Sequence, residues 1–494
     1  MESKYAIKEY HDAAKITAEL DELIKKPIYS VSPEALKQYE EDYYAKKCVK
    51  SKEMIGKAAE LIPGGVQHNL AFNYPFPLVF TKAEGGYLYD IDGNRYFDFI
   101  QAGGPTVLGS NPPEVREKVI ELLNTCGPST GLFHEYEYKL AQKIHECIKS
   151  VEMFRMLGSG TEGCMAAIRI ARLATKKKNI IKMGGAYHGW SDQLAYGIRI
   201  PGSKWTQASG VPRYIFKHTQ EFFPNDLKDL ERKLRANKLR GGTAAVFIEP
   251  VGPESGTRPL DFNFNKGVEA LCRKYGALLI FDEVVTAFRI GMGGAQGYFG
   301  VTPDLTIFGK VVAGGYPGAG GIGGKKEYMK YLAAGIAGGG KHKKALVGGT
   351  MAATPVSCVA GYHMLCEMES QNACQKAGLM GDRLTAGLQE LIKKHNLPFV
   401  AFNQGSICHL ETVGTMHFAI NWKKPWTIVK VLKATSERKK EMEHMGAAYM
   451  AEGLVTLAGS RLYTSAAYTE EMIDEALACF DRLFANVTTK KDAE

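Results

Sequence analysis

The chain has 494 residues, of which 45% are hydrophobic and 23% charged, a balance typical of folded globular proteins rather than disordered or fibrous ones. Its formal net charge of +9 is modest, and its basic residues occur in short scattered runs that indicate solvated faces, so no nucleic-acid partner is expected. The ten cysteines form no CxxC pair and no apolar run is long enough to cross a bilayer, so we predict a cytoplasmic protein with free thiols and no membrane partner.

Residues 1–104 are predicted to form an N-terminal extension that ends in a hairpin. Helical spacing over the first 60 residues is interrupted near Pro27 and Pro33, which predicts two or three short helices. Alternating aromatic residues then flank an Asp-Gly-Asn turn at 92–94, a strong signal for a β-hairpin. No residue of this extension indicates chemistry by itself.

Strand and helix patterns alternate through residues 105–355. Such alternation predicts an α/β domain with a largely parallel sheet, helices on its faces and ligands at its carboxyl edge. Residues 356–494 are predicted to form a smaller α+β domain with helices at 356–369, 378–395 and 470–484 around a strand-rich middle. In the large domain we expect strands at 153–157, 179–183, 244–248, 278–281 and 305–308, and helices at 113–126, 134–150, 165–173 and 266–275.

Lys310 stands in an apolar run, two residues after a strand pattern that ends at Phe308. Burial lowers the pKa of a lysine, and a neutral amine attacks a carbonyl to form a Schiff base. The alternative is a lysine whose charged end reaches water from the end of a strand. Asp282 and Glu283 follow another buried strand pattern and place a carboxylate at the same edge, although a helix cap or surface ion pair also explains them.

The stretch GSGTEG, residues 158–163, follows a strand pattern and opens a helix. Small residues at such a junction let a phosphate approach the free backbone N–H groups, and the helix dipole favours the anion. The hydroxyls of Ser159 and Thr161 are further donors. No lysine follows the second glycine, so this is not a Walker motif, and a plain helix N-cap remains the alternative.

Tyr187 and His188 follow another strand pattern, where an aromatic ring can stack on a flat heterocycle. A core or surface tyrosine is the alternative. A metal site formed by His188 with Asp192 is not favoured, because no second pair of ligands has a matching spacing, and we predict no metal.

A phosphate cradle, a stacking ring, a carboxylate and an amine together suit pyridoxal 5′-phosphate, whose protein partners are a Schiff-base lysine and a group that pairs with the pyridinium nitrogen. From about residue 62 onward the chain resembles the class III aminotransferases of fold type I, and within them the glutamate-1-semialdehyde aminomutase branch. The motifs that carry this resemblance are FDEV (281–284), FR (288–289), GAQ (294–296), FGVTPDL (299–305) and GK (309–310).

The resemblance implies a seven-stranded, mostly parallel sheet and a role for each matching residue. Lys310 is implied to hold the cofactor as a Schiff base and then to move the proton, while Asp282 pairs with the ring nitrogen. Thr350 is implied to reach the phosphate in the neighbouring subunit, which makes a homodimer part of the prediction. The other implied cofactor residues are Ser159, Gly160 and Thr161 at the phosphate, Tyr187 and Val284 on the two ring faces, and His188 and Glu249; Tyr187 also counts among the catalytic residues.

Four positions are predicted to contact substrate because they depart from the aminomutase pattern. Glu254 replaces an asparagine and Arg461 replaces a glutamate, which looks more like the ornithine and 4-aminobutyrate aminotransferases, where a glutamate masks an arginine that grips the 2-oxo acid. A structural salt bridge, or no contact, is the alternative for this pair. Trp190 replaces the second histidine of the YHGH motif, and His68 lies in a loop at 67–76 that lacks the arginine of some relatives.

We therefore predict an aminotransferase that moves an amino group between a small-molecule amine or amino acid and a 2-oxo acid. An aminomutase or racemase on the same scaffold is the first alternative. A non-catalytic protein that keeps the fold is the second, and intact Lys310 and Asp282 argue against it.

Overall fold

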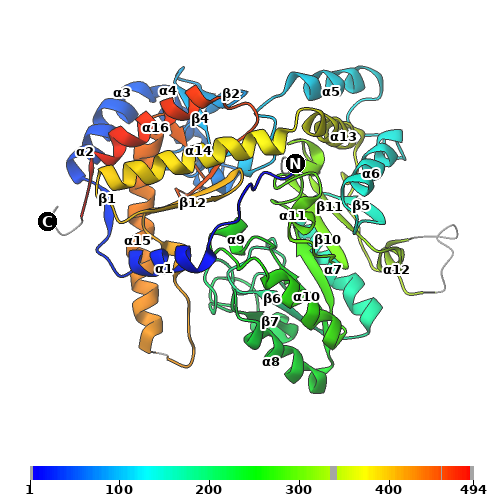
Figure 1. Cartoon of the computed structure of the whole chain (residues 1–494). Coiled ribbons are helices and arrows are strands. Elements are labelled where there is room, and N and C mark those ends of the chain that lie inside the picture. Colours follow the sequence, from blue (N-terminus) through cyan, green and yellow to red (C-terminus); the bar gives the residue numbers. More distant parts are fainter. Residues whose placement is uncertain (1–3, 334–341, 425, 458, 490–494) are drawn as a thin grey trace. The chain divides into compact units, whose positions relative to one another are not determined.

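The computed structural model describes residues 4–333, 342–424, 426–457 and 459–489 (Figure 1). It contains two compact units: Met1–Tyr5, Pro113–Cys374 and Ala419–Ile428 form the first, and Ala6–Pro112, Gln375–Phe418 and Val429–Glu494 the second. The division into 1–104, 105–355 and 356–494 stays a prediction about domains, whereas the compact units group most of the N-terminal segment with the C-terminal one.

A seven-stranded sheet is the main element of the first unit, with the strand order β5-β11-β10-β9-β8-β6-β7. Strand β11 is antiparallel to both neighbours, and the remaining neighbours are parallel, so the predicted α/β fold with a mostly parallel seven-stranded sheet is confirmed. The strands are β5 (Met153–Leu157), β6 (Asn179–Met183), β7 (Thr219–Phe222), β8 (Thr243–Ile248), β9 (Leu278–Asp282), β10 (Leu305–Gly309) and β11 (Gly320–Gly324).

The sequence patterns miss β7 and β11. Strand β11 reads GGIGG and therefore lacks the branched and aromatic side chains that signal a strand. Its glycines allow close packing, because a Cβ atom on Gly320 would overlap the backbone of Ser159. The expectation that 153–157 is a buried strand is wrong in part: Met153 and Arg155 are exposed, because β5 lies at the edge of the sheet.

Helix α7 (Gly160–Thr175) packs across β8 to β11 and begins where Ser159 caps it, with the Ser159 hydroxyl accepting from the backbone N–H of Glu162 at 3.3 Å. Its alanine and isoleucine side chains join the strands in one buried core. Helices α8 and α10 pack against each other and against the strands β7 to β9. The other helices of this unit are α5 (Pro113–Thr125), α6 (Glu135–Cys147), α8 (Leu227–Asn237), α9 (Pro253–Gly256), α10 (Phe264–Tyr275), α11 (Gly294–Phe299), α12 (Lys326–Met329) and α13 (Pro355–Ser370).

The second unit has three small sheets, in the orders β1-β16, β12-β13-β15 and β14-β4-β3-β2. The predicted hairpin is present, since Tyr87 pairs with Phe97 across β3 and β4. Its strands are β1 (Tyr29–Val31), β2 (Phe80–Glu84), β3 (Tyr87–Asp90), β4 (Arg95–Asp98), β12 (Val400–Gln404), β13 (Ile407–Glu411), β14 (Leu454–Val455), β15 (Arg461–Tyr463) and β16 (Val487–Thr489).

Helices enclose a second core formed mainly by leucine, phenylalanine and alanine side chains. The predicted final helix is confirmed as α16, but the strand-rich middle is only partly right, because a 26-residue helix, α15, follows the strands. Its first residues include the β-branched run Thr-Ile-Val, which hides the helical period. The helices are α1 (Ala13–Leu23), α2 (Pro33–Gln38), α3 (Ala45–Lys47), α4 (Val49–Ala58), α14 (Ala373–Lys394), α15 (Trp426–Ala451) and α16 (Glu470–Phe484), with a π-helix η1 (Tyr39–Tyr44).

Short 3-10 helices complete both units, and one of them, η7, begins at Lys310. All ten cysteines are free thiols. Within the described ranges, no helix has both the length and the apolar composition needed to cross a bilayer. The 3-10 helices are η2 (Pro63–Gly65), η3 (Asn69–Ala71), η4 (Gln101–Gly103), η5 (Arg213–His218), η6 (Lys238–Arg240), η7 (Lys310–Ala313), η8 (Lys330–Leu332) and η10 (Thr415–His417).

Candidate active site

Five parallel strands of the first unit lead into the predicted site residues. The carboxyl ends of parallel strands lie at one edge of a sheet, which is where ligands bind in α/β folds. The sheet topology therefore explains why residues far apart in sequence meet at one place. Strands β5, β6, β8, β9 and β10 end at or just before Ser159, Tyr187, Glu249, Asp282 and Lys310 respectively.

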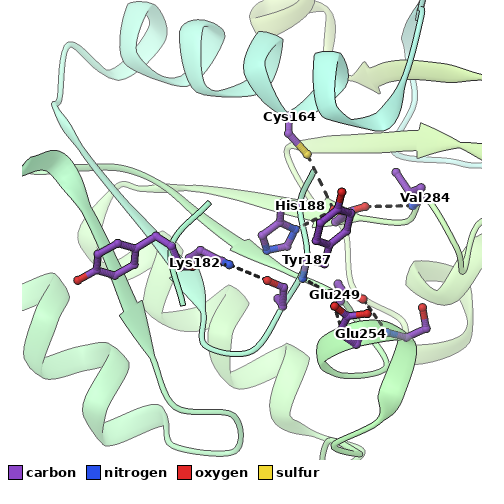
Figure 2. A network of polar contacts seen from close by, with 11 residues as sticks. Cys164, Lys182, Tyr187, His188, Glu249, Glu254 and Val284 are labelled. Carbon is purple, nitrogen blue, oxygen red and sulfur yellow. Dashed lines mark hydrogen bonds and ion pairs between the residues drawn. The ribbon is translucent and has the colours of Figure 1, made fainter. Parts of the chain in front are cut away.

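Asp282 is buried at the end of β9 and its carboxylate is held from several sides. Its Oδ2 accepts from Nδ1 of His188 at 2.7 Å, and its Oδ1 accepts from the backbone N–H of Val284 at 3.1 Å. The thiol of Cys164, on α7, points at the same carboxylate with Sγ 3.9 Å from Oδ2 (Figure 2). Burial is the main influence on the pKa of His188 and lowers it, which favours a neutral imidazole that donates to Asp282.

The start of α7 is a ready site for an anion. The first amides of a helix have no acceptor within it, and those of Gly160 and Thr161 stand at this position. Gly160 also lies against Val284, because a Cβ on Gly160 would approach Val284 Cγ2 to 2.6 Å. A Cβ on Gly309 would come within 2.7 Å of the other methyl group of Val284. Val284 thus packs between the helix start and the turn that carries Lys310.

Lys310 is partly buried and has a left-handed backbone with φ of 49°. Non-glycine residues rarely adopt this conformation, and they keep it only where the surrounding structure imposes it. The strand before it, β10, lies beside β9, with Ile307 in register with Asp282. The predicted amine and the predicted carboxylate therefore stand at the ends of neighbouring strands.

Glu249 joins the Tyr187 segment to the turn at Glu254. Its carboxylate accepts from the backbone N–H groups of Tyr187 at 2.9 Å, Glu254 at 3.0 Å and Ser255 at 2.8 Å (Figure 2). Glu254 and Ser255 have left-handed φ values of 51° and 61°, so Glu249 stabilises a strained turn. Burial, helped by the charges of Asp282 and Glu254, raises the pKa of Glu249 to about 8.

Lys182 was not singled out by sequence, although it interrupts the apolar strand NIIKM. It is fully buried in β6, and its ammonium group donates to the carbonyl groups of Ala186 at 2.6 Å and Tyr196 at 2.7 Å. Burial lowers its pKa to about 8. Lys182 therefore ties together two parts of the loop that carries Tyr187 and His188. A charged residue inside a fully apolar strand pattern was the signal that could have identified it.

The predicted substrate residues are divided between the units. Glu254 and Trp190 belong to the first, where Glu254 is buried and the Trp190 side chain is 78% exposed. His68 and Arg461 belong to the second unit, so the predicted pairing of Glu254 with Arg461 stays a prediction. His68 caps η3 through its Nδ1, which accepts from Leu70 N at 3.1 Å.

Arg461 is buried in β15 and has an acidic neighbour within its own unit. Burial raises the pKa of Glu411 to about 7, and the positive charge of Arg461 opposes this rise. Thr350, in the first unit, is exposed. The role predicted for Thr350 in the neighbouring subunit stays a prediction.

The site also contains three potential metal ligands. The ligand atoms of Cys164, His188 and Asp282 all lie within 4.8 Å of one another. The pairing considered from sequence, His188 with Asp192, is not formed in this way, since His188 is buried against Asp282 and Asp192 is exposed. The expectation of no metal stays a prediction.

Residues 70–473 match the sequence model of the family "Aminotransferase class-III", and the chain belongs to this family. Glutamate-1-semialdehyde 2,1-aminomutase 1 of Lachnoclostridium phytofermentans is 34% identical over 449 residues, which cover 89% of this chain and 99% of that protein. The predicted family and its aminomutase-like branch are thereby confirmed.

Two solved structures show the same fold. An omega-transaminase from Sphaerobacter thermophilus is 26% identical with a TM-score of 0.77, over 90% of this chain and 99% of that one. A glutamate-1-semialdehyde aminomutase from Pseudomonas aeruginosa is 19% identical with a TM-score of 0.75, over 95% and 98% of the two chains. The relatives thus include both a transaminase and aminomutases.

Proposed function

We propose that the protein is a pyridoxal 5′-phosphate-dependent aminotransferase that moves an amino group from an amino acid or amine to a 2-oxo acid. The observation that carries this proposal is the placement of the Asp282–His188 pair, the start of α7 and Lys310 at one edge of the sheet. The cofactor supplies an aldehyde that condenses with amines and a ring that accepts an electron pair.

The residues of the site fit this cofactor. Asp282 offers a buried carboxylate to a protonated ring nitrogen, and His188 keeps that carboxylate oriented by donating to Oδ2. The amides of Gly160 and Thr161 and the hydroxyl of Ser159 suit a phosphate group, because they are donors at a helix N-terminus. A solved transaminase with PLP bound, 23% identical with a TM-score of 0.76, has the same fold.

The chain's own residues would share the work as follows. Lys310 Nζ would hold the cofactor covalently, and its free amine would take and return the proton at the carbon that carries the amino group of the substrate. Val284 would cover one face of the ring, and Tyr187, whose backbone N–H donates to Glu249, would cover the other. Asp282 would pair with the ring nitrogen and keep it protonated, which favours the electron-accepting form of the ring.

The proposal includes a homodimer in a cytoplasmic setting. Thr350 is exposed, and we assign it to the phosphate in the neighbouring subunit. The ten free thiols agree with a reducing compartment. Trp190, His68, Glu254 and Arg461 are the proposed substrate contacts.

An intramolecular aminomutase is the second candidate, because a relative at 34% identity carries that name. Glu254 and Arg461, which replace the asparagine and glutamate of the aminomutase pattern, favour the aminotransferase. A racemase remains the other alternative on this scaffold.

One experiment separates these reactions. Purified holoenzyme is mixed with single α-, β- and ω-amino donors without any acceptor, while the cofactor absorbance and the products are recorded. An aminotransferase releases one oxo product per site and leaves the cofactor in its aminated form. Release of an isomer of the donor over many turnovers, with no acceptor present, would contradict the proposal.

A further inference from the structure

Arg199 lies beside Glu254 in the candidate site. Its Nε is 3.7 Å from Glu254 Oε1, and the two side chains differ sharply in exposure, at 62% for Arg199 and 9% for Glu254. The ion pair therefore involves Nε of the guanidinium group rather than its terminal nitrogens. In the part of the chain that the structure describes, no further ion pair or hydrogen bond engages the terminal nitrogens of Arg199.

The backbone fixes Arg199 next to the segment that carries Tyr187. The N–H of Arg199 donates to the carbonyl of Gly185 at 2.9 Å, and the N–H of Gly185 donates to the carbonyl of Gly197 at 2.7 Å. Arg199 also has a left-handed backbone with φ of 59°. Because two hydrogen bonds across the loop hold its strained backbone, Arg199 has a defined position.

Two buried charges below the loop add to this rigidity. Lys182 donates to the carbonyl groups of Ala186 and Tyr196, while Glu221 accepts from the N–H of Gly202 at 3.0 Å. These contacts fix the loop on both sides of Arg199. The backbone of Arg199 is thus held in place, although its side chain is exposed.

The Arg199 charge acts at the place where Tyr187 stands. Burial is the main cause that raises the pKa of Tyr187; the charge of Glu254 adds to the rise and that of Arg199 opposes it. The guanidinium group lies 3.7 Å from the Glu254 carboxylate, and the charges of both act on the phenol. Tyr187 is itself 46% exposed, so this cluster is open to a small molecule.

We propose that Arg199 binds the carboxylate of the amino donor, so that the substrates are amino acids rather than simple amines. This inference rests on the proposed function and names the substrate class of the same site. A guanidinium group presents parallel N–H donors that match the two oxygens of a carboxylate. Glu254 orients the guanidinium group through Nε, so that its two terminal nitrogens can bind the ligand.

The test compares Arg199→Gln with a matched control, Arg213→Gln, in the holoenzyme. Arg213 is an exposed arginine that lies over the ring of Trp205 at 4.9 Å, outside the candidate site. Half-reaction rates are measured with donors that differ only by a carboxylate, such as 4-aminobutyrate and propylamine, or β-alanine and ethylamine. Binding of the unreactive acids propionate and butyrate is measured separately by calorimetry.

We expect Arg199→Gln to weaken the binding of the acids and the apparent affinity for the carboxylated donors by about ten- to a hundredfold, the usual value of a charge-assisted pair. The paired amines and the Arg213→Gln variant should be unaffected. Arg199→Lys keeps the positive charge but lacks the paired N–H donors, so its affinity for the acids should lie between those of the unaltered protein and Arg199→Gln. The thermal unfolding midpoint of each variant checks that it is folded.

The inference is overturned if Arg199→Gln binds the acids as the unaltered protein does, or if it slows the amines and the amino acids equally. Failure of the proposed function looks different: no donor changes the cofactor absorbance of the unaltered enzyme. Calorimetry with the unreactive acids still reports on Arg199 in that case.

Discussion

Lys182 and Glu221 face each other in register on the neighbouring parallel strands β6 and β7, and both are buried. Each side chain binds backbone groups of the loop from 184 to 204 instead of solvent. Lys182 binds carbonyl groups, and Glu221 binds the N–H groups of Gly202 and Lys204, each at 3.0 Å. Two opposite charges inside the protein thus hold the loop on which Tyr187, His188 and Arg199 stand.

Lys182→Met should loosen this loop. The substitution leaves the carbonyl groups of Ala186 and Tyr196 buried without their donor, which costs about 1–3 kcal/mol for each group that water cannot reach. Urea unfolding should therefore show a clear loss of stability. The exposed Lys228→Met should change the free energy of unfolding by less than about 0.5 kcal/mol. If the two variants had equal free energies of unfolding, the hydrogen bonds of Lys182 to the loop would not contribute to stability.

Glu249 should make the stability depend on pH. Its folded-state pKa of about 8 is raised above the ordinary value of 4.5, so the folded protein binds the proton more tightly than the unfolded chain. This contribution is complete below pH 4.5 and is lost as pH rises towards 8. Glu249→Gln should flatten the fall in unfolding free energy between these values, whereas the exposed Glu117→Gln should reproduce the unaltered curve. An unchanged slope in Glu249→Gln would show that Glu249 titrates normally.

Asp282→Asn should retain the cofactor and lose most of the turnover. The amide still accepts a hydrogen bond, but it does not stabilise a protonated ring nitrogen, so we expect kcat to fall by at least about 100-fold. Bound cofactor is counted by absorbance and kcat is measured on the same sample. The control is Asp192→Asn, an exposed aspartate on the loop after β6. Loss of the cofactor together with activity would instead indicate a structural role for Asp282.

The strand ends were the predictable part of this protein. Asp282 and Lys310 follow apolar strand patterns directly, and the alternation of strands and helices places both at one edge, so the fold class and the central pair were accessible from sequence. Strand β11 was not, because its glycines serve close packing, such as that of Gly320 against the backbone of Ser159, rather than strand propensity. Arg199 was missed because its role depends on a loop whose path no periodic pattern encodes. Lys182 had a signal, since it interrupts an apolar strand pattern, but its partners lie on that same loop.

Thr350→Ala tests the proposed contribution to the neighbouring site. Loss of one hydroxyl donor to a phosphate should weaken cofactor retention by about three- to tenfold, measured by equilibrium dialysis. The exposed Thr302→Ala serves as the control. Size-exclusion chromatography with light scattering should find a dimer for all three proteins. A monomeric enzyme that retains the cofactor fully would contradict the assignment of Thr350.

Lys310 is proposed to form a covalent bond with the cofactor through its amine. Borohydride reduction of the holoenzyme followed by peptide mass spectrometry tests it most directly. We expect one reduced pyridoxyl phosphate group per chain, on the peptide containing Lys310, and none in Lys310→Ala. A label on another lysine, or no label on a cofactor-loaded enzyme, would contradict it.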